Sequence, residues 1–318
     1  MNSKERVQTA LNHQQPDRPP LDLGGAFTTT INVVAYDRLR WTLGLPAKDS
    51  LLREQTQSVI VDEDVRRALG VDVIGLYERP PIPEREQPDE DGNLVSEWGI
   101  IYRQSEGSAR GAAYTMVTHP LAEATLADLE TYPWPDPDDP GRYLDLAEKV
   151  KHLYETTDYA LVAGAIGMGL FEQAQCLRGI QQFFEDLLIN QDFASRLIDK
   201  ILQIQLRIFD RYLAVVGPYV EMVETSDDYG MQTGPLISPG LYREMLQPAH
   251  KRLNRFIKER TEAKIFLHSC GSIAAVLDDL IDAGVDVINP VQPRARDMDS
   301  TMLKSRFGDR VVFHGGVD

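Results

Sequence analysis

A histidine and a cysteine stand two residues apart directly after an apolar run of the chain. The run 264–268 (KIFLH) ends at His268 and continues into Ser269, Cys270 and Gly271. Residues i and i+2 at the end of an extended strand point to the same side, so the imidazole and the thiol are expected to converge. Zn²⁺ accepts nitrogen and sulfur ligands in tetrahedral sites, and we predict that His268 and Cys270 bind a metal. On spacing alone, a buried cysteine beside a hydrogen-bonded histidine is the alternative.

A metal site needs at least a third ligand, which has to come from another strand end. The other cysteine, Cys176, lies on the apolar stripe of a predicted helix and is expected in the core. The remaining candidate donors are Glu172, Glu224, Asp227, Asp228 and His314, or a residue after position 318.

Two adjacent carboxylates, Asp227 and Asp228, follow the apolar run 220–225 (VEMVET). They could orient a substrate, complete a metal shell or act as a general base, and we predict catalytic roles for both. Adjacent residues of an extended chain point to opposite sides, so one of the two is expected to face the pocket. The alternative is an acidic loop that caps the following helix.

Further polar side chains follow other apolar runs, and the carboxyl ends of parallel strands are where function gathers. We predict that five of them contact a substrate. They are Tyr77, Gln232, Asn289, Gln292 and His314.

Seven apolar runs are predicted to be the strands that position these groups. Most are nearly continuous in apolar residues, which is typical of parallel strands covered on both faces. The runs are 20–24, 71–76, 159–166, 220–225, 264–268, 285–290 and 311–315. Segments with helical periodicity alternate with them, notably 170–189, 193–216 and 241–260. This alternation predicts an α/β protein with a parallel sheet, either open or closed into a barrel.

The part of the chain from 79 to 139 does not show this alternation of apolar runs and helical segments. It is rich in Pro, Asp, Glu and Gly, shows weak two-residue alternation (LVSEWGIIYR, AAYTMVTHP) and contains PWPDPDDPGR. We predict an excursion with a hairpin and an acidic, proline-rich linker, inside a single barrel domain over 1–318. Such an excursion could serve as a lid or an oligomer contact.

The composition narrows the class of protein. The chain has 318 residues, of which 42% are hydrophobic and 26% charged, as in ordinary globular proteins. A net charge of −16 disfavours nucleic acid and anionic membrane surfaces as partners. No run approaches the roughly 18 apolar residues of a membrane helix, and the N-terminus lacks the apolar core of a secretory signal. Two cysteines provide no disulfide framework, so we expect a cytoplasmic protein.

Several segments, in order and over nearly the whole chain, resemble the uroporphyrinogen decarboxylase-like superfamily. The resemblance implies a (β/α)8 TIM barrel. Because such a barrel has eight strands and seven runs are found, the last βα unit is expected to be missing from this sequence. The segments are 4–20 (KERVQTALNHQQPDRPP), 170–190, 227–253, 266–273, 285–292 and the terminal FHGGVD.

Two chemistries occur in this superfamily. True uroporphyrinogen decarboxylases carry arginines after the first strand that hold the substrate's carboxylates, but this sequence has LGGAFTT at 23–29, without an arginine. The closer resemblance is to zinc-dependent corrinoid methyltransferases, whose His-x-Cys matches His268 and Cys270. The third zinc ligand of those enzymes lies on the last strand, which is expected beyond Asp318.

The resemblance therefore implies a methyltransferase that moves a methyl group to or from a corrinoid protein. It would use a zinc-activated thiol or a zinc-polarised substrate. The implied partners are the corrinoid protein, a small-molecule methyl donor or acceptor and, in a homo-oligomer, further copies of the chain. The alternatives are a cofactor-free decarboxylase of a porphyrinogen-like substrate and a non-catalytic tetrapyrrole-binding protein.

Overall fold

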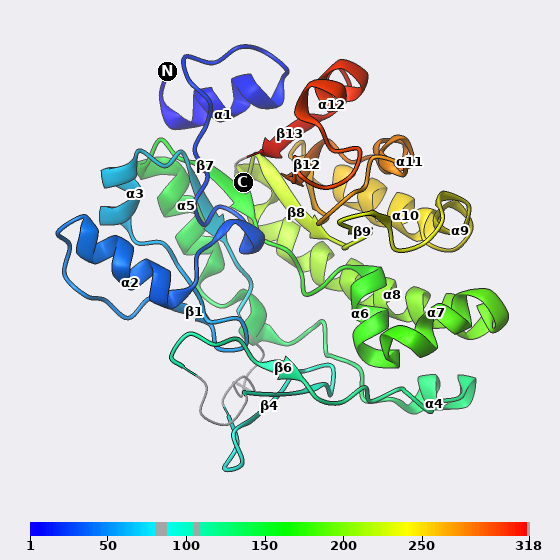
Figure 1. Cartoon of the computed structure of the whole chain (residues 1–318). Helices are drawn as coiled ribbons and strands as arrows, with labels where there is room; N and C mark the ends of the chain where they lie inside the picture. Colours follow the sequence, from blue (N-terminus) through cyan, green and yellow to red (C-terminus); the bar gives the residue numbers. More distant parts are fainter. Residues whose placement is uncertain (80–87, 105–108, 317–318) are drawn as a thin grey trace.

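The computed structural model describes residues 1–79, 88–104 and 109–316. Six parallel strands form its central sheet, and their order in space is their order along the chain (Figure 1). The sheet curls into part of a (β/α) barrel, so the TIM-barrel class predicted from the sequence is confirmed. The strands are β3 (Val73–Leu76), β7 (Ala160–Ala163), β8 (Met222–Ser226), β11 (Lys264–His268), β12 (Val287–Val291) and β13 (Val312–Gly315).

Helices connect successive strands and cover the outside of the sheet (Figure 1). They are α5 (Leu146–Thr156), α6 (Leu170–Arg178), α7 (Ile180–Ile189), α8 (Gln191–Val216), α9 (Pro239–Met245), α10 (Gln247–Lys258), α11 (Leu277–Asp282) and α12 (Ser300–Phe307). None of the helices in the described part of the chain combines the length and the apolar character that crossing a membrane requires.

Two helices predicted as continuous are each divided. The predicted helix 170–189 is broken at Gly179, whose φ of 89° separates α6 from α7. Glycine adopts this conformation without a Cβ clash. The predicted helix 241–260 is broken at Leu246, two residues before Pro248. A proline has no N–H for the preceding turn, so α9 ends and α10 begins here.

The predicted first strand, 20–24, is wrong. This segment forms no ladder: the N–H of Asp72 donates to the carbonyl of Leu21 at 2.8 Å, and the Asp22 carboxylate turns back to the N–H of Gly25. Pro20 supplies no N–H, and Gly24 has a φ of 79°. On the other side, Asp22 Oδ2 lies 3.1 Å from His314 Nε2 of β13. The segment thus bridges β3 and β13, the two edge strands of the sheet.

The excursion forms an antiparallel sheet at the end of the barrel opposite α1 (Ser3–Leu11) (Figure 1). The predicted hairpin is β4 (Asn93–Val95) and β5 (Ile101–Arg103), and β6 (Thr115–Met116) pairs with β5. The parts of this prediction at 80–87 and 105–108 lie outside the described residues. Trp98 of the excursion belongs to the same buried hydrophobic cluster as residues of β3 and β7. That the chain forms a single domain over 1–318 stays a prediction.

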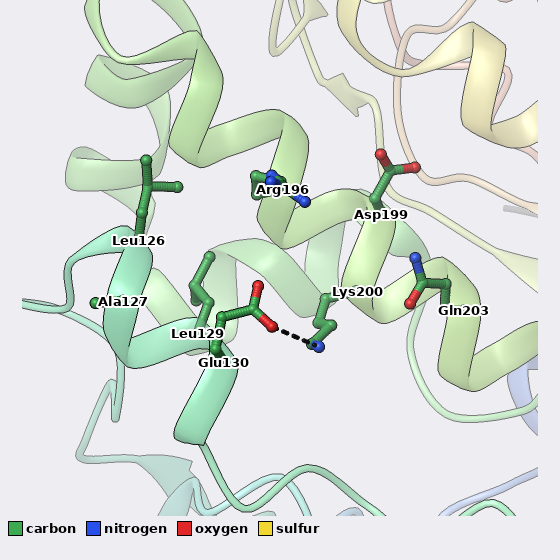
Figure 2. A pocket seen from close by; sticks show the side chains of 8 residues that line it. All are labelled: Leu126, Ala127, Leu129, Glu130, Arg196, Asp199, Lys200 and Gln203. Carbon is green, nitrogen blue, oxygen red and sulfur yellow. Dashed lines mark ion pairs between the residues drawn. The ribbon is translucent and has the colours of Figure 1, made fainter.

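Smaller elements fill the remaining described chain. They are α2 (Val33–Thr42), β1 (Leu51–Arg53), β2 (Ser58–Val59), α3 (Glu63–Leu69), α4 (Leu126–Thr131), β9 (Gly230–Met231) and β10 (Gly234–Pro235). A pocket of about 500 Å³ lies between α4 and α8, where Lys200 pairs with Glu130 at 3.6 Å (Figure 2). It belongs to the helical layer and contains no strand-end residue.

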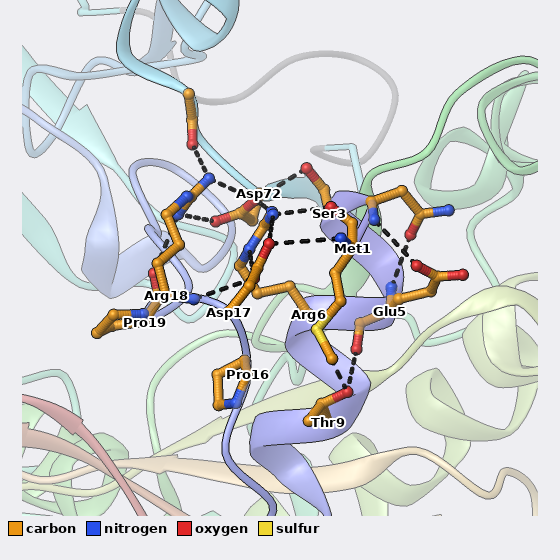
Figure 3. Close-up of polar contacts among 12 residues, drawn as sticks. Met1, Ser3, Glu5, Arg6, Thr9, Pro16, Asp17, Arg18, Pro19 and Asp72 are labelled. Atoms are coloured by element: carbon orange, nitrogen blue, oxygen red, sulfur yellow. Dashed lines mark hydrogen bonds and ion pairs between the residues drawn. The ribbon is translucent and has the colours of Figure 1, made fainter.

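A buried carboxylate ties the N-terminal segment to the barrel (Figure 3). Asp72, directly before β3, has no exposed surface. Its oxygens accept hydrogen bonds at 2.7–2.8 Å from Arg6 Nη1, Arg18 Nη1, Ser3 Oγ and Leu21 N. Segment 4–20 thus has a structural role, at the end of the barrel opposite the excursion.

Candidate metal centre and barrel mouth

Three side chains with metal-binding atoms converge after β8 and β11. One ligand atom from each of Asp228, His268 and Cys270 lies within 4.8 Å of the other two. His268 Nε2 is 3.3 Å from Cys270 Sγ and 3.8 Å from Asp228 Oδ1. β8 and β11 are parallel neighbours with Ser226 opposite His268, so the residues that follow both strands meet at one edge of the sheet. Within the described ranges, no other group of His, Cys, Asp or Glu side chains meets this criterion.

The donor set and its spacing fit a zinc ion. Zinc bonds of about 2.0–2.1 Å to nitrogen and 2.3 Å to sulfur place tetrahedral ligand atoms roughly 3.6 Å apart. The separations of 3.3 and 3.8 Å bracket that value. Three protein ligands with a fourth position for substrate are typical of catalytic zinc sites. Metal binding by His268 and Cys270 stays a prediction, and Asp228, one of the candidate donors named from the sequence, lies close enough to be a third ligand.

A hydrogen bond behind His268 sets its tautomer. His268 Nδ1 lies 2.7 Å from Asn289 Oδ1 on β12. We assign the proton to Nδ1, because an amide oxygen can only accept a hydrogen bond. The lone pair of the imidazole is then on Nε2, which faces Cys270 and Asp228. A second residue that orients the ligand in this way is the usual arrangement behind metal-bound histidines.

The hydrogen bond between His268 and Asn289 is the first of a chain of hydrogen bonds, the relay, which continues across the sheet. Asn289 Nδ2 lies 2.8 Å from His314 Nδ1 on β13, and His314 Nε2 lies 3.1 Å from Asp22 Oδ2. Asn289 is only 5% exposed, and both ends of its amide are used. Both nitrogens of His314 are also engaged, so both side chains support His268 in this structure. The substrate contacts predicted for Asn289 and His314 stay predictions.

Replacing Asn289 with leucine is expected to weaken zinc binding by roughly 10–100-fold, as is typical when a residue that orients a metal ligand is lost. Competition with a chromophoric chelator measures the affinity. The aspartate variant, which still accepts from His268 Nδ1, should retain more affinity. Asn254→Leu is the control, because Asn254 is equally buried on α10 but bonds the carbonyl of Ala283. Unchanged affinity in folded Asn289→Leu protein would exclude this role.

The two adjacent aspartates have different environments. Asp228 is about one third exposed, and one of its oxygens accepts from the N–H of Cys270 at 2.7 Å. Asp227 is fully buried, and its carboxylate accepts from the N–H groups of Phe171 and Glu172, which begin α6. It is also 2.8–2.9 Å from Tyr229 Oη and His250 Nε2. The Asp227 carboxylate therefore anchors α6 and the 227–229 loop, and the catalytic roles predicted for Asp227 and Asp228 stay predictions.

Burial shifts the pKa values of two groups at this edge. Burial, with the nearby Asp228 carboxylate, raises the pKa of the Cys270 thiol to about 12. Without a metal the thiol is therefore protonated near neutral pH, and a metal that bound it would displace the proton. Burial, followed by the charges of Asp227 and Asp228, raises the pKa of Glu172 to about 7. Its Oε2 accepts from Ser226 Oγ at 2.9 Å, so Glu172 adjoins the centre without joining the ligand cluster.

The other predicted contact residues lie around the mouth. Gln292 Oε1 accepts from the N–H of Gly271 at 2.8 Å and lies 3.5 Å from Gln232 Nε2. Both glutamines thus lie beside the loop that carries Cys270. The hydroxyl of Tyr77 donates to the carbonyl of Gly24 at 3.0 Å. Substrate contacts by Tyr77, Gln232 and Gln292 stay predictions.

A cavity of about 630 Å³ opens beside the ends of β3 and β7. Tyr77, Gly167 and Met168 line it from the strand ends, and Trp98 lines it from the excursion. Of the described lining residues, sequence reasoning named Tyr77 as a contact residue and missed the others, among them Arg53 and Gln173. No local signal marks Arg53, and Gln173 lies within a segment predicted only as a helix.

The fold and the position of the cluster define a TIM-barrel protein whose chemical groups lie at the carboxyl ends of its strands. Residues 110–318 match the uroporphyrinogen decarboxylase (URO-D) family, and the chain belongs to this family. The resemblance predicted from the sequence is thereby confirmed. Among solved structures, a methyltransferase from Methanosarcina mazei is similar, with a TM-score of 0.57 and 16% identity over 95% of this chain and 81% of that chain. At this identity the likeness shows the fold. No curated protein matches this sequence.

Proposed function

We propose that this protein is a zinc-dependent methyltransferase that moves a methyl group between a corrinoid protein and a small molecule. The observation that carries the proposal is the convergence of imidazole nitrogen, thiol sulfur and carboxylate oxygen after β8 and β11. The similar fold of a methyltransferase supports it. We infer that Asp228, one of the candidate donors named from the sequence, is the third ligand.

His268, Cys270 and Asp228 would hold the zinc ion. Bound zinc supplies Lewis acidity, which lowers the pKa of a substrate thiol or polarises an ether oxygen. Asn289 keeps the proton of His268 on Nδ1, so the imidazole is a neutral ligand through Nε2. The N–H of Cys270 donates to Asp228 and holds the carboxylate beside the thiol. Asp227 fixes the start of α6 against the same loop.

The methyl transfer requires no additional oxidant or reductant. The corrinoid is a substrate carried by the partner protein. The thiolate sulfur of the acceptor forms a bond to the methyl carbon while the cobalt–carbon bond breaks, and both electrons of that bond stay on cobalt. With a methyl ether as donor, the reverse transfer takes the methyl group to reduced cobalt, and the leaving oxygen gains a proton.

Decarboxylation of a porphyrinogen is the second candidate, because the family takes its name from that reaction. The structure provides no cationic clamp in segment 23–29. Instead, the N–H groups of Phe27 and Thr28 bind the fully buried carboxylate of Glu224 on β8, at 2.8 and 3.0 Å. A substrate with many carboxylates would leave several of them without a partner here, which is costly.

One pair of assays separates the two candidates. Protein purified after zinc-replete expression is incubated with methylcobalamin and a panel of thiols, and in parallel with uroporphyrinogen. We expect loss of the methylcobalamin spectrum with formation of a methyl thioether, and no consumption of uroporphyrinogen. Efficient conversion of uroporphyrinogen to coproporphyrinogen would reject the methyltransferase proposal, and so would zinc-free wild-type protein.

A further inference from the structure

We infer that the 630 Å³ cavity beside β3 and β7 binds a small organic acid with an apolar body. The inference goes beyond the proposed function and does not depend on it. The volume lies within the range of about 300–1,000 Å³ that is usual for small-molecule sites. Neither His268 nor Cys270 lines the cavity. It is therefore a separate binding region at the carboxyl ends of the strands.

A buried amide in the wall requires a hydrogen-bond acceptor. Gln173 on α6 lines the cavity and is only 2% exposed. Its Nε2 has no hydrogen-bond partner among the described residues. A buried donor without a partner is costly, and native proteins rarely keep one without a reason. An acidic oxygen of a ligand would provide the acceptor that Gln173 lacks.

A cation from β1 lies in the same wall. The guanidinium of Arg53 is 4.6 Å from the centre of the Phe27 ring, within the segment that lacks arginines of its own. Within the described ranges, Arg53 forms no ion pair. Arg79 pairs with Asp145 at 3.2 Å, and Arg142 pairs with Glu78 and Glu97. Arg53 is thus available to a carboxylate of a ligand.

The charges of the wall leave no room for a polyanion. The described lining holds four cations, Arg53, Arg79, Arg142 and Lys149, and four carboxylates, Glu54, Glu78, Glu97 and Asp145. Because the cations are balanced in number, the wall is unsuited to the many carboxylates of a porphyrinogen, whereas Arg53, which has no ion pair among the described residues, could bind a single acidic group. The rest of the wall is largely apolar and would contact the body of the ligand; it includes Leu51, Leu52, Ile60, Ile100, Leu146 and Met168.

Calorimetric titration with simple probes tests this site. The probes are 4-methoxybenzoate, hexanoate and the neutral 4-methoxybenzamide. We expect saturable binding of at least one acid and binding of the amide that is at least about tenfold weaker than that of 4-methoxybenzoate or undetectable. Arg53→Met should weaken acid binding about 10–100-fold, as expected for a lost charge-assisted hydrogen bond, and Gln173→Leu should also weaken it. Arg38→Met is the control, because Arg38 is an exposed arginine of α2 outside the cavity.

The outcomes distinguish this inference from the proposed function. Absence of binding by both acids, an amide that binds as well as 4-methoxybenzoate, or unchanged acid affinity in folded Arg53→Met and Gln173→Leu proteins would overturn the inference. Melting temperatures confirm that each variant is folded. Cys270→Ala should bind the acid as the wild type does. Acid binding by a wild-type protein that holds no zinc would support the cavity and reject the zinc mechanism.

Discussion

Replacing Cys270 with alanine is expected to remove zinc and abolish methyl transfer while the barrel stays folded. The substitution deletes the only sulfur among the three converging donors. Cys270 is half-buried and follows β11 at the edge of the sheet, so little core packing is lost. The loss of zinc affinity should exceed the roughly 10–100-fold effect of removing an orienting residue such as Asn289. Elemental analysis gives the zinc content, expected to be about one ion per wild-type chain.

The chain contains a matched control in its other cysteine. Cys176 lies on α6, and its Sγ is 3.5 Å from the sulfur of Met168. Burial raises the pKa of this thiol to about 12, and Cys176 is not in the metal-binding cluster. Cys176→Ala should therefore keep its zinc and unfold at a lower temperature. Cys270→Ala protein that retains zinc, or turns over at the wild-type rate, would reject the mechanism.

Replacing Asp72 with alanine is expected to lower the free energy of unfolding by about 3–5 kcal/mol, the range measured when one partner of a buried ion pair is removed. The variant leaves the nearly buried guanidinium of Arg6 without its Asp72 partner and frees the N–H of Leu21. It also detaches Arg18, which brings the N-terminal segment to β3. Urea unfolding followed by circular dichroism measures the change.

The same carboxylate predicts a pH dependence. Burial raises the pKa of Asp72, but hydrogen bonds from Leu21, Arg18, Ser3 and Arg6 outweigh burial and lower the pKa below its ordinary value. A group whose pKa is lower in the folded state stabilises the fold above its unfolded pKa of about 3.9. Its contribution is lost as the pH falls through the folded value. The difference between wild type and Asp72→Ala should therefore shrink in acid.

Asp278 provides the matched control for this prediction. It also pairs with two arginines, Arg306 at 3.0 Å and Arg310 at 2.6 Å, but its side chain is 49% exposed. Water screens such a pair, so Asp278→Ala should change stability by about 1 kcal/mol or less. Equal effects of the two substitutions would show that burial of Asp72 does not determine its contribution.

The sequence predicted the strands best where local pattern and burial agree. The run 264–268 is β11 to the residue, because its apolar residues are buried on both faces. The run 20–24 failed, because its neighbours, β3 and β13, are distant in sequence and because Pro20 and Gly24 disfavour a ladder. The helix 170–189 failed only at Gly179, where the apolar stripe continues through a break in the backbone.

Only those parts of the candidate site that lie at the end of one strand could be predicted from the sequence. The spacing of His268 and Cys270 is local, and the two side chains lie together as that spacing indicates. The contacts of Asn289 with His268 and His314 depend on three strands in register, which no local pattern reveals. The choice between Asp227 and Asp228 depended on where α6 begins.

The bridge from Asp22 to His314 would couple a metal bound at His268 to the two edges of the sheet. This contact lies where the segment after α1 meets β13, and the same chain of hydrogen bonds ends at Nδ1 of His268, the nitrogen opposite the proposed ligand atom Nε2. Zinc that binds the oriented His268 more tightly than a free one would also stabilise the joined edges, by thermodynamic linkage. The reciprocal also holds, because any change that separates Asp22 from His314 would lower the affinity for zinc. A bound zinc ion would thus stabilise the contact between the two edge strands of the sheet, in addition to its role in the reaction.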